Sequence, residues 1–252
     1  MGQTEEDVFD AHFHIIDDRF PLVPNDGYLP PRFNVDDYRA ATTGLGITEG
    51  AVVSGSFQAF DQTYLGAALQ ALGPGFVGVT QLPADVSEAE ISRLHDLGVR
   101  AVRLNVRRGG SAPAAAADAL ARRVYEAAGW HTELYVDATE LEPFFPLLRA
   151  VPCMGVDHLG LRASGLENLL RWVERGGFVK ATGFGRLDFN PADALESLFA
   201  ANPDALVFGT DLPSTRAPRA FTEADLATVR DALGTEAAER VLSANARAIY
   251  LK

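Results

Sequence analysis

The chain has 252 residues and a formal net charge of −12, with 34 acidic side chains against 22 basic ones. This negative charge argues against nucleic acid or an anionic membrane surface as a partner, although a pocket can still present a local positive field to a small anion. The chain contains no run of about 18 apolar residues, so no membrane span is predicted. The single cysteine, Cys153, and the polar, acidic start Met1–Asp7, which is unlike a signal peptide, predict a cytoplasmic protein without disulfides.

Apolar, β-branched segments predict eight strands along the chain. They are Val8–His14, Ala51–Gly55, Phe76–Gln81, Ala101–Val106, Thr132–Asp137, Cys153–Asp157, Phe178–Gly183 and Ala205–Gly209. Amphipathic segments between and after the strands predict helices. These lie near Asp36–Leu45, Gln62–Leu72, Ser87–Leu97, Ala114–Ala128, Leu141–Ala150, Gly165–Arg175, Pro191–Ala200, Thr222–Leu233 and Thr235–Ile249. Several helices also carry boundary signals, such as Ser87 and Asn190 before a first turn and Gly98 after a last one.

Strand and helix alternating eight times with short connections is typical of one (β/α)₈ TIM barrel, here spanning residues 1–252 with an extra C-terminal helix. The rival architecture is an open doubly wound sheet. That fold would carry a glycine-rich phosphate loop after an early strand, and the chain has neither G-x-G-x-x-G nor G-x-x-x-x-G-K. In a barrel, functional groups are expected where the strands end.

The first predicted strand ends in two histidines. Residues two apart in a strand point to the same side, so Asp10, His12 and His14 are predicted to share the inward face. Two neutral imidazoles at the mouth of a barrel suit either the binding of a divalent metal or the stabilisation of a developing oxyanion.

Further chemically active side chains stand at or just past the later strand ends. They are Ser54, Ser56, Gln81, Arg103, Asn105, Tyr135, Asp137, His158, Arg186 and Asp211. The two remaining histidines, His95 late in a helix and His131 at a strand start, are predicted to be structural. The long, proline-rich loops Ile15–Phe33 and Leu212–Phe221 are predicted to form walls of the pocket.

Three motifs, taken together, resemble the amidohydrolase superfamily. They are Asp10-Ala11-His12-Phe13-His14 on the first strand, Val156-Asp157-His158-Leu159-Gly160 after the sixth, and Phe208-Gly209-Thr210-Asp211-Leu212-Pro213 after the eighth. Within the superfamily, Val102–Arg108, Trp130–Tyr135 and Lys180–Gly183 are similar to the branch of the 2-pyrone-4,6-dicarboxylate and sugar-acid lactonases. The resemblance covers essentially the whole chain and implies a hydrolase that acts on a carboxylic ester.

The chain departs from the binuclear members of that superfamily at two metal ligands. Where those members carry a lysine, the fourth strand offers Arg103 and Asn105, and where they carry a histidine, the fifth offers Tyr135. A two-metal site is therefore not expected. The ligands that remain suit one Zn²⁺, or catalysis without any metal, as the pyrone dicarboxylate lactonase is thought to use; both stay open. These remaining residues are His12, His14, His158 and Asp211.

The resemblance implies hydrolysis of a small carboxylated lactone, such as a 2-pyrone-4,6-dicarboxylate-like or muconolactone-like product of aromatic-compound degradation. Asp211 would be the general base that activates water, and the three histidines would stabilise the negative charge on the carbonyl oxygen. Five residues match those that bind substrate carboxylates in the lactonase, namely Ser54, Arg103, Arg108, Tyr135 and Arg186. Arg107 is nearly as good a match as Arg108, and Arg216 and Arg219 are weaker candidates.

Other functions stay open. A mononuclear Zn²⁺ sugar-acid lactonase or decarboxylase would use the same histidines and aspartate, although a decarboxylase usually keeps a histidine at the position of Tyr135. The missing lysine disfavours a Zn²⁺ amidase or phosphoesterase. A non-catalytic barrel that binds an anionic metabolite would have no need of a base beside three imidazoles. The sequence indicates no oligomeric state.

Overall fold

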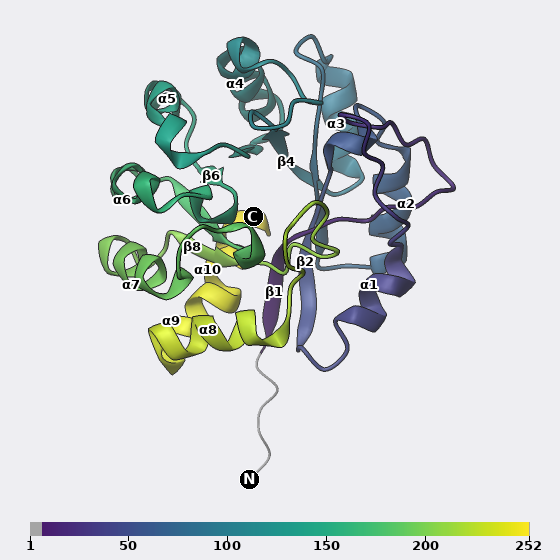
Figure 1. The fold of residues 1–252 in the computed structure, drawn as a ribbon. Helices are drawn as coiled ribbons and strands as arrows, with labels where there is room; N and C mark the ends of the chain where they lie inside the picture. The colour runs from purple at the N-terminus through teal and green to yellow at the C-terminus, as the bar shows by residue number, and fades with distance from the viewer. Residues whose placement is uncertain (1–6, 252) are drawn as a thin grey trace.

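Eight parallel strands form a single sheet in the order β1 to β8, with the helices outside it (Figure 1). The computed structural model describes residues 7–251. Lys252 lies outside this range, and so do residues 1–6, which make up most of the acidic start that is unlike a signal peptide. The strands are β1 Val8–Phe13, β2 Ile47–Val53, β3 Phe76–Thr80, β4 Val99–Leu104, β5 His131–Leu134, β6 Met154–Val156, β7 Phe178–Ala181 and β8 Leu206–Phe208. The predicted (β/α)₈ barrel is confirmed.

The helices alternate with the strands as predicted. They are α1 Val35–Ala41, α2 Thr63–Leu72, α3 Glu88–Asp96, α4 Ala117–Ala128, α5 Phe145–Ala150, α6 Leu166–Glu174, α7 Pro191–Ala201, α8 Glu223–Leu233, α9 Thr235–Glu239 and α10 Asn245–Tyr250. The single final helix predicted from the sequence is in fact interrupted by a π-helical turn, Arg240–Ala244. None of the helices within residues 7–251 has the length and apolar character of a membrane span.

The boundary signals read from the sequence act as predicted. Ser87 accepts a hydrogen bond from the backbone of Glu90 at 3.2 Å, and Asn190 caps the start of α7 in the same way. Gly98, at φ +100°, follows the end of α3. The first helix ends four residues early, at Ala41, because the hydroxyl of Thr42 bonds back to a carbonyl of the last turn.

The barrel interior is filled by small and apolar side chains from the strands. Together with two residues of α10, they form a separate cluster made of Phe9, Ala11, Ala51, Val53, Val77, Val79, Ala101, Phe178, Val207, Ala246 and Tyr250. The rings of Phe9 and Tyr250 stack with centroids 5.4 Å apart. In Figure 1 the C-terminus lies near the middle of the ring of strands. The C-terminal helix α10 therefore closes one end of the barrel, and a functional pocket is expected at the other end.

The sheet closes through the segment that follows β8. The backbone N–H of Asp211 donates to the carbonyl of His12 at 2.7 Å, and that of His14 donates to the carbonyl of Leu212 at 2.7 Å. These bonds continue the parallel pairing beyond the last residue of β8. They hold Asp211 against the two histidines of β1.

Asp10 does not share the inward face with His12 and His14, contrary to the strict alternation expected from the sequence. Its carboxylate accepts hydrogen bonds from Tyr38 of α1 at 3.0 Å and from the backbone and hydroxyl of Thr210 at 2.8 and 2.7 Å. The register of β1 against β2 shifts between Asp10 and Phe13. Such a bulge adds a residue and reverses the alternation beyond it.

We predict that Tyr38→Phe destabilises the protein by about 1–3 kcal/mol near neutral pH, because it leaves a buried carboxylate short of a donor. Burial raises the pKa of Asp10 from 3.8 to about 6, while the bonds from Thr210 and Tyr38 oppose this rise. The folded state thus keeps a proton that the unfolded state loses, and stability falls as pH rises through this window. Removing the phenol raises the folded pKa further, so the loss is larger at about pH 8 than at about pH 4.5.

Urea unfolding at both pH values measures this difference. Tyr64→Phe is the matched control, because within residues 7–251 the phenol of Tyr64 bonds only to the neutral hydroxyl of Ser54, at 2.7 Å. Its cost should be the same at both pH values. A pH-independent cost for Tyr38→Phe would contradict the assignment.

Candidate active site

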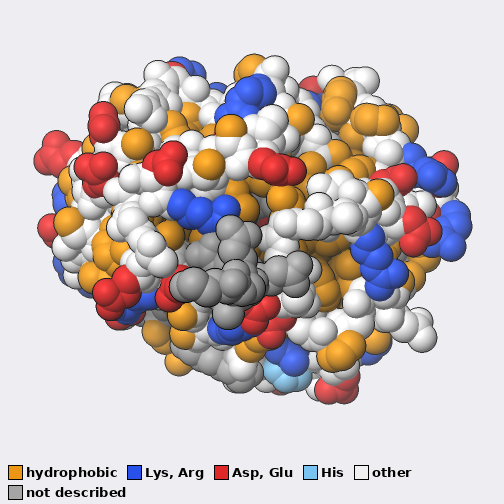
Figure 2. All heavy atoms as spheres, turned by 90° about the horizontal axis from the view of Figure 1, so that it is seen from below, with side chains coloured by type: hydrophobic (Ala, Val, Ile, Leu, Met, Phe, Trp, Pro, Cys, Tyr) orange, Lys and Arg blue, Asp and Glu red, His pale blue; other side chains and the backbone are white. Residues whose placement is uncertain are grey.

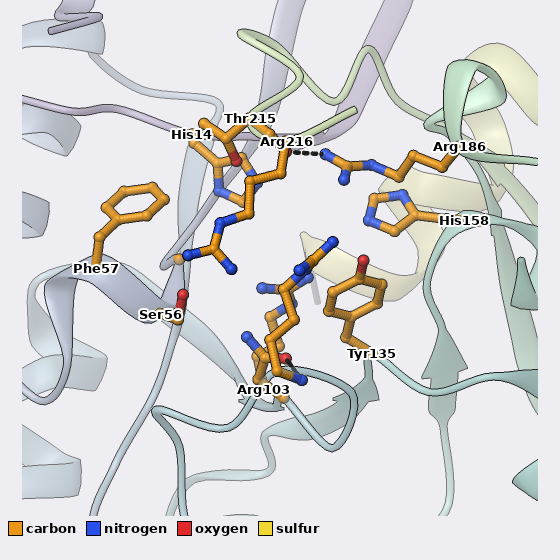
Figure 3. Close-up of a pocket in the computed structure, with 12 residues that line it drawn as sticks. His14, Ser56, Phe57, Arg103, Tyr135, His158, Arg186, Thr215 and Arg216 are labelled. Carbon is orange, nitrogen blue, oxygen red and sulfur yellow. Dashed lines mark hydrogen bonds between the residues drawn. The ribbon is translucent and has the colours of Figure 1, made fainter. Parts of the chain in front are cut away.

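A pocket opens where the strands end (Figure 3). Its walls carry four arginines, two histidines and a tyrosine among the residues His14, Gly55, Ser56, Phe57, Arg103, Asn105, Arg108, Tyr135, His158, Arg186, Thr215 and Arg216. Short 3₁₀ turns after β2, β6 and β7, at Ser56–Gln58, His158–Gly160 and Phe184–Arg186, deliver several of them. The clustering of functional groups at the strand ends is as expected for a barrel.

Three imidazoles surround one carboxylate oxygen at the base of this pocket. The Nε2 atoms of His12, His14 and His158 lie 3.9, 3.8 and 3.9 Å from Oδ1 of Asp211. All four side chains are buried. Within residues 7–251, neither His12 Nε2 nor Asp211 Oδ1 has a hydrogen-bond partner. The four residues predicted to be catalytic are thus brought together, with unused bonding capacity aimed at a common point.

Unusual backbone conformations aim these side chains. His158 and Asp211 have φ values of 52° and 60°, in the left-handed region, which costs of order 1–3 kcal/mol for a residue other than glycine. Two glycines make the space. A Cβ on Gly183 would lie 2.6 Å from Nδ1 of His158, and one on Gly209 would lie 2.6 Å from the backbone nitrogen of His12.

The imidazoles are neutral. Burial, with the nearby charge of Arg103, lowers the pKa of His14 to about 3. Burial likewise lowers the pKa of His12 and that of His158 well below 6.5, with help from nearby positive charges. Nδ1 of His14 lies 2.7 Å from the carbonyl of Val53, which can only accept, so the proton of His14 is on Nδ1 and its Nε2 carries a lone pair.

Asp211 is held by one oxygen and open at the other. Arg186 donates from Nε to Oδ2 at 2.7 Å, and its Nη2 donates to the carbonyl of Thr215 at 3.0 Å. Burial raises the pKa of Asp211, and the charge and hydrogen bond of Arg186 oppose that rise. The arginine therefore favours the ionised carboxylate while leaving Oδ1 free.

The arginines divide into those that line the pocket and those that do not. Arg103 donates to Asp157 at 2.9 Å and lies over the ring of Tyr135. Arg108 lines the pocket, whereas Arg107 points to Asp137, 3.9 Å away. The structure thus favours Arg108 in the choice that the sequence left open.

Loop residues hold a fourth arginine over the pocket. Arg216 lines it, with its guanidinium 4.5 Å from the ring centroid of Tyr28 and bonded to the carbonyl of Asn25. Figure 3 shows Arg103, Arg186 and Arg216 pointing into the same space. Arg219 instead pairs with Asp225 at 2.7 Å and does not line the pocket. The loop after β8 is therefore a wall, as predicted. The first loop is not: none of Ile15–Phe33 is among the described residues that line the pocket, and this loop contacts Arg216 through Asn25 and Tyr28 instead.

Ser54 is placed differently from the other predicted substrate contacts. Its hydroxyl bonds to Tyr64 of α2 at 2.7 Å, and the residue is not part of the pocket lining. Ser56, two residues later, does line the pocket. The strand ends at Val53, so alternation no longer decides which serine points inward.

Three buried charged residues for which the sequence predicts no role lie beneath the pocket. Lys180 of β7 donates to Glu133 of β5 at 2.5 Å, and Asp157, quoted only as part of a motif, pairs with Arg103. Each is fully buried. The available signal was a lysine and a glutamate inside otherwise uncharged strand segments, since such residues are almost never buried without a partner.

The histidines outside the pocket are structural, as predicted. His131 is buried at the start of β5, with Nε2 3.1 Å from Glu133 and its ring against Tyr250. His95, in the last turn of α3, accepts a hydrogen bond from the indole of Trp130 at 3.2 Å.

The donor atoms at the base of the pocket suit a divalent ion, and a second group beneath them, His12, Glu133 and Asp157, is also compact enough to hold one. Atoms of His12, His158 and Asp211 all lie within 4.8 Å of one another, and His14 Nε2 lies 3.8 Å from Asp211. The ligands of a tetrahedral zinc lie about 3.4 Å apart, so small movements would suffice. The unpartnered atoms on His12 and Asp211 are consistent with such a site.

A parallel barrel with histidines and an aspartate at its mouth is the architecture of a hydrolase-type TIM barrel. The chain belongs to the amidohydrolase family, whose model, described as "Amidohydrolase", matches residues 9–252.

Individual proteins are also similar to this chain. A 2-pyrone-4,6-dicarboxylate hydrolase of Comamonas testosteroni is 30% identical over 156 residues, 60% of this chain and about half (51%) of that relative. A D-galactarolactone isomerase of Agrobacterium fabrum is 27% identical over 221 residues, 81% of this chain and 75% of the relative. A probable 2-pyrone-4,6-dicarboxylic acid hydrolase of Acinetobacter baumannii with citric acid bound has the same fold, with a TM-score of 0.84, 19% identity, and 98% and 100% of the two chains covered.

Gly183→Ala should displace the ring of His158, because the added methyl carbon would meet Nδ1. Gly176→Ala is the matched control, since Gly176 also has a left-handed backbone, at φ +88°, but has nothing within 4 Å of an added Cβ. Both variants should lose about 1–2 kcal/mol in urea unfolding for the backbone strain alone. Only Gly183→Ala should lose more and shift the ring NMR signals of His158. Unchanged His158 signals in that variant would contradict the proposed packing.

Proposed function

We propose that the protein hydrolyses the ring of a small lactone that carries two carboxylates. The observation that carries the proposal is the free Oδ1 of Asp211, 3.8–3.9 Å from three neutral imidazole nitrogens at the base of an arginine-lined pocket. A carboxylate beside neutral imidazoles can take a proton from water without a competing positive charge on the rings.

In the proposed mechanism, water sits between Asp211 and the lactone carbonyl. Oδ1 of Asp211 takes one proton as the water oxygen bonds to the carbonyl carbon. Because His14 presents a lone pair at Nε2, its role is to accept the other proton of that water in a hydrogen bond and so orient the attack. The oxyanion is left to His12 and His158. Collapse breaks the ring C–O bond, and the leaving oxygen receives the proton from Asp211.

The charge balance of the pocket supports a dianionic substrate. Arg103 and Arg186 already pair with Asp157 and Asp211. Arg108 has no ion pair within 4 Å among the described residues, and Arg216 faces only an exposed aspartate at 4.0 Å. Two guanidinium groups therefore remain for two carboxylates, each able to bind in a bidentate fork.

The relatives support the same class of substrate. Two of them are named for a pyrone dicarboxylate, and the Acinetobacter structure contains citric acid, a polycarboxylate. The positive pocket is a local feature, because the chain as a whole is acidic. On the face seen in Figure 2, acidic, basic and apolar side chains are interspersed.

A divalent ion would also suit this site. It would be held by His12, His14, His158 and Asp211, and when bound it would polarise the carbonyl and lower the pKa of water. The chain's own residues keep their tasks of binding the carboxylates and closing the pocket. The relative named as a D-galactarolactone isomerase favours sugar-acid lactones as a second substrate class.

The test is hydrolysis of a panel of lactones, with 2-pyrone-4,6-dicarboxylate, a muconolactone and galactarolactone as members, before and after dialysis against a chelator. Asp211→Asn should lower kcat by about 10²–10⁴-fold on the substrate that is turned over. Hydrolysis of the dicarboxylate in preference to the others supports the proposal. Tight binding of all three without turnover would replace it by a non-catalytic anion-binding barrel.

Arg108→Met should raise KM about 10- to 100-fold with little change in kcat, since it removes a charged contact to a part of the substrate that does not react. Arg107→Met is the matched control and should leave both constants near those of the parent, because Arg107 faces Asp137 outside the pocket. Steady-state kinetics on the preferred lactone measures both. Equal effects of the two substitutions would remove the charge argument for a dicarboxylate.

A further inference from the structure

A buried ammonium group lies directly beneath His12. Lys180 reaches from β7 into the barrel and is fully buried. Its Nζ lies 2.5 Å from Oε2 of Glu133, 2.9 Å from the carbonyl of Ala11 and 3.4 Å from Nδ1 of His12. An ammonium group has three protons and no lone pair, so these three neighbours are its three acceptors.

Two carboxylates lie beside this lysine. Glu133 is in direct contact, and Oδ1 of Asp157 lies 3.9 Å away. Burial would raise the pKa of Glu133, but the charge of Lys180 and the contact with His131 hold it below its usual value. The phenol of Tyr250 donates to the second oxygen of Glu133. The carboxylate is thus anchored from the closed end of the barrel, and it holds the ammonium in place.

A charged donor at Nδ1 decides which nitrogen of His12 carries the proton. If Nδ1 carried it, an N–H would face the ammonium at 3.4 Å; Oδ1 of Asp157 lies equally far from Nδ1, at 3.4 Å, but has no hydrogen bond to it within residues 7–251. If Nδ1 carries a lone pair, the third proton of Lys180 is satisfied. The ring then holds its single proton on Nε2, which points to Asp211 and has no partner among the described residues.

We propose that Lys180 is a positioning residue, which fixes the proton of His12 on Nε2 and so makes this ring the donor to the substrate's carbonyl oxygen. The role as donor rests on the function proposed above; the position of the proton does not. His14, two residues along the same strand, has the opposite tautomer, because Val53 takes its Nδ1 proton. One strand thereby supplies a donor and an acceptor to the same pocket.

The tautomer also bears on the metal question. A nitrogen that carries a proton has no lone pair for an ion, so His12 can bind zinc through Nε2 only after losing that proton or moving it to Nδ1, against the ammonium. Lys180 is therefore expected to weaken zinc binding at a site whose donor positions otherwise fit.

The test is NMR of the full chain with ¹⁵N-labelled histidine, read through two- and three-bond ¹H–¹⁵N couplings in the ring. We expect His12 to show an unprotonated Nδ1 and a protonated Nε2, and His14 to show the reverse as an internal reference. His12→Gln assigns the signals. A protonated Nδ1 on His12 would overturn the proposal.

Variants separate positioning from structure. Lys180→Met together with Glu133→Gln removes the donor without leaving a buried charge unpaired, whereas Glu133→Gln alone keeps the contact between Lys180 and His12. The double variant should show a mixture of His12 tautomers, a kcat lowered by up to about 10²–10³-fold with KM little changed, and tighter zinc binding in equilibrium dialysis. The single variant should keep the parent tautomer. The same tautomer in all three proteins would overturn the role of Lys180.

The two proposals fail in different ways. A protein with His12 protonated on Nε2 that hydrolyses no lactone keeps the positioning role of Lys180 and loses the function. A protein that hydrolyses the dicarboxylate lactone with His12 protonated on Nδ1 keeps the function and loses the positioning role.

Discussion

The candidate site depends on how the barrel is closed between its first and last strands. The two hydrogen bonds between β1 and the segment Asp211–Leu212 are backbone bonds, so they set the distance from His12 and His14 to Asp211 whatever the surrounding loops do. The close approach needs Gly209, since a Cβ there would meet the backbone of His12. Thr210 then ties the same segment to Asp10 on the far side of β1. A carboxylate and its neighbouring imidazoles are thereby fixed by the fold itself, which is the condition for electrostatic preorganisation.

Buried charges at the mouth follow one rule: each carboxylate has its own cation. Asp211 pairs with Arg186, Asp157 with Arg103, and Glu133 with Lys180. Burying a charge is costly unless it is paired, so removing one member of a pair would leave an uncompensated charge. The pairing also explains why four arginines at one mouth do not amount to four free positive charges. Only those without a buried carboxylate are left to hold an anion.

The sequence predicts well both the barrel and the gathering of the histidines around Asp211 at its mouth, because both depend on local patterns. Apolar runs alternating with amphipathic ones define a (β/α)₈ order, and the motifs around His12, His158 and Asp211 sit at strand ends where a barrel gathers them. The predictions that fail depend on details of the backbone that the alternation of side chains along a strand does not determine. The bulge after Asp10 turns that residue outward, and the early end of β2 leaves Ser54 facing Tyr64. The choice of Arg108 over Arg107 needed the path of a loop, and the partner of Lys180 needed the register of β5 against β7 across the barrel.

The distribution of protons in the pocket is a property of the whole barrel. His12 and His14 are two buried, neutral histidines only two residues apart. Their Nδ1 atoms nevertheless have opposite kinds of partner, a hydrogen-bond donor for His12 and an acceptor for His14. For His14 the partner is a backbone carbonyl of β2, which can only accept. For His12 it is the ammonium of Lys180, which can only donate and which is anchored through Glu133 to Tyr250 of the C-terminal helix. The helix that closes the far end of the barrel is therefore connected, through two buried side chains, to Nδ1 of His12, across the ring from the nitrogen that would meet the substrate. A site that needs both a donor and an acceptor obtains them from two identical imidazoles, because β2 supplies an acceptor to Nδ1 of His14 and β7 supplies a donor to Nδ1 of His12.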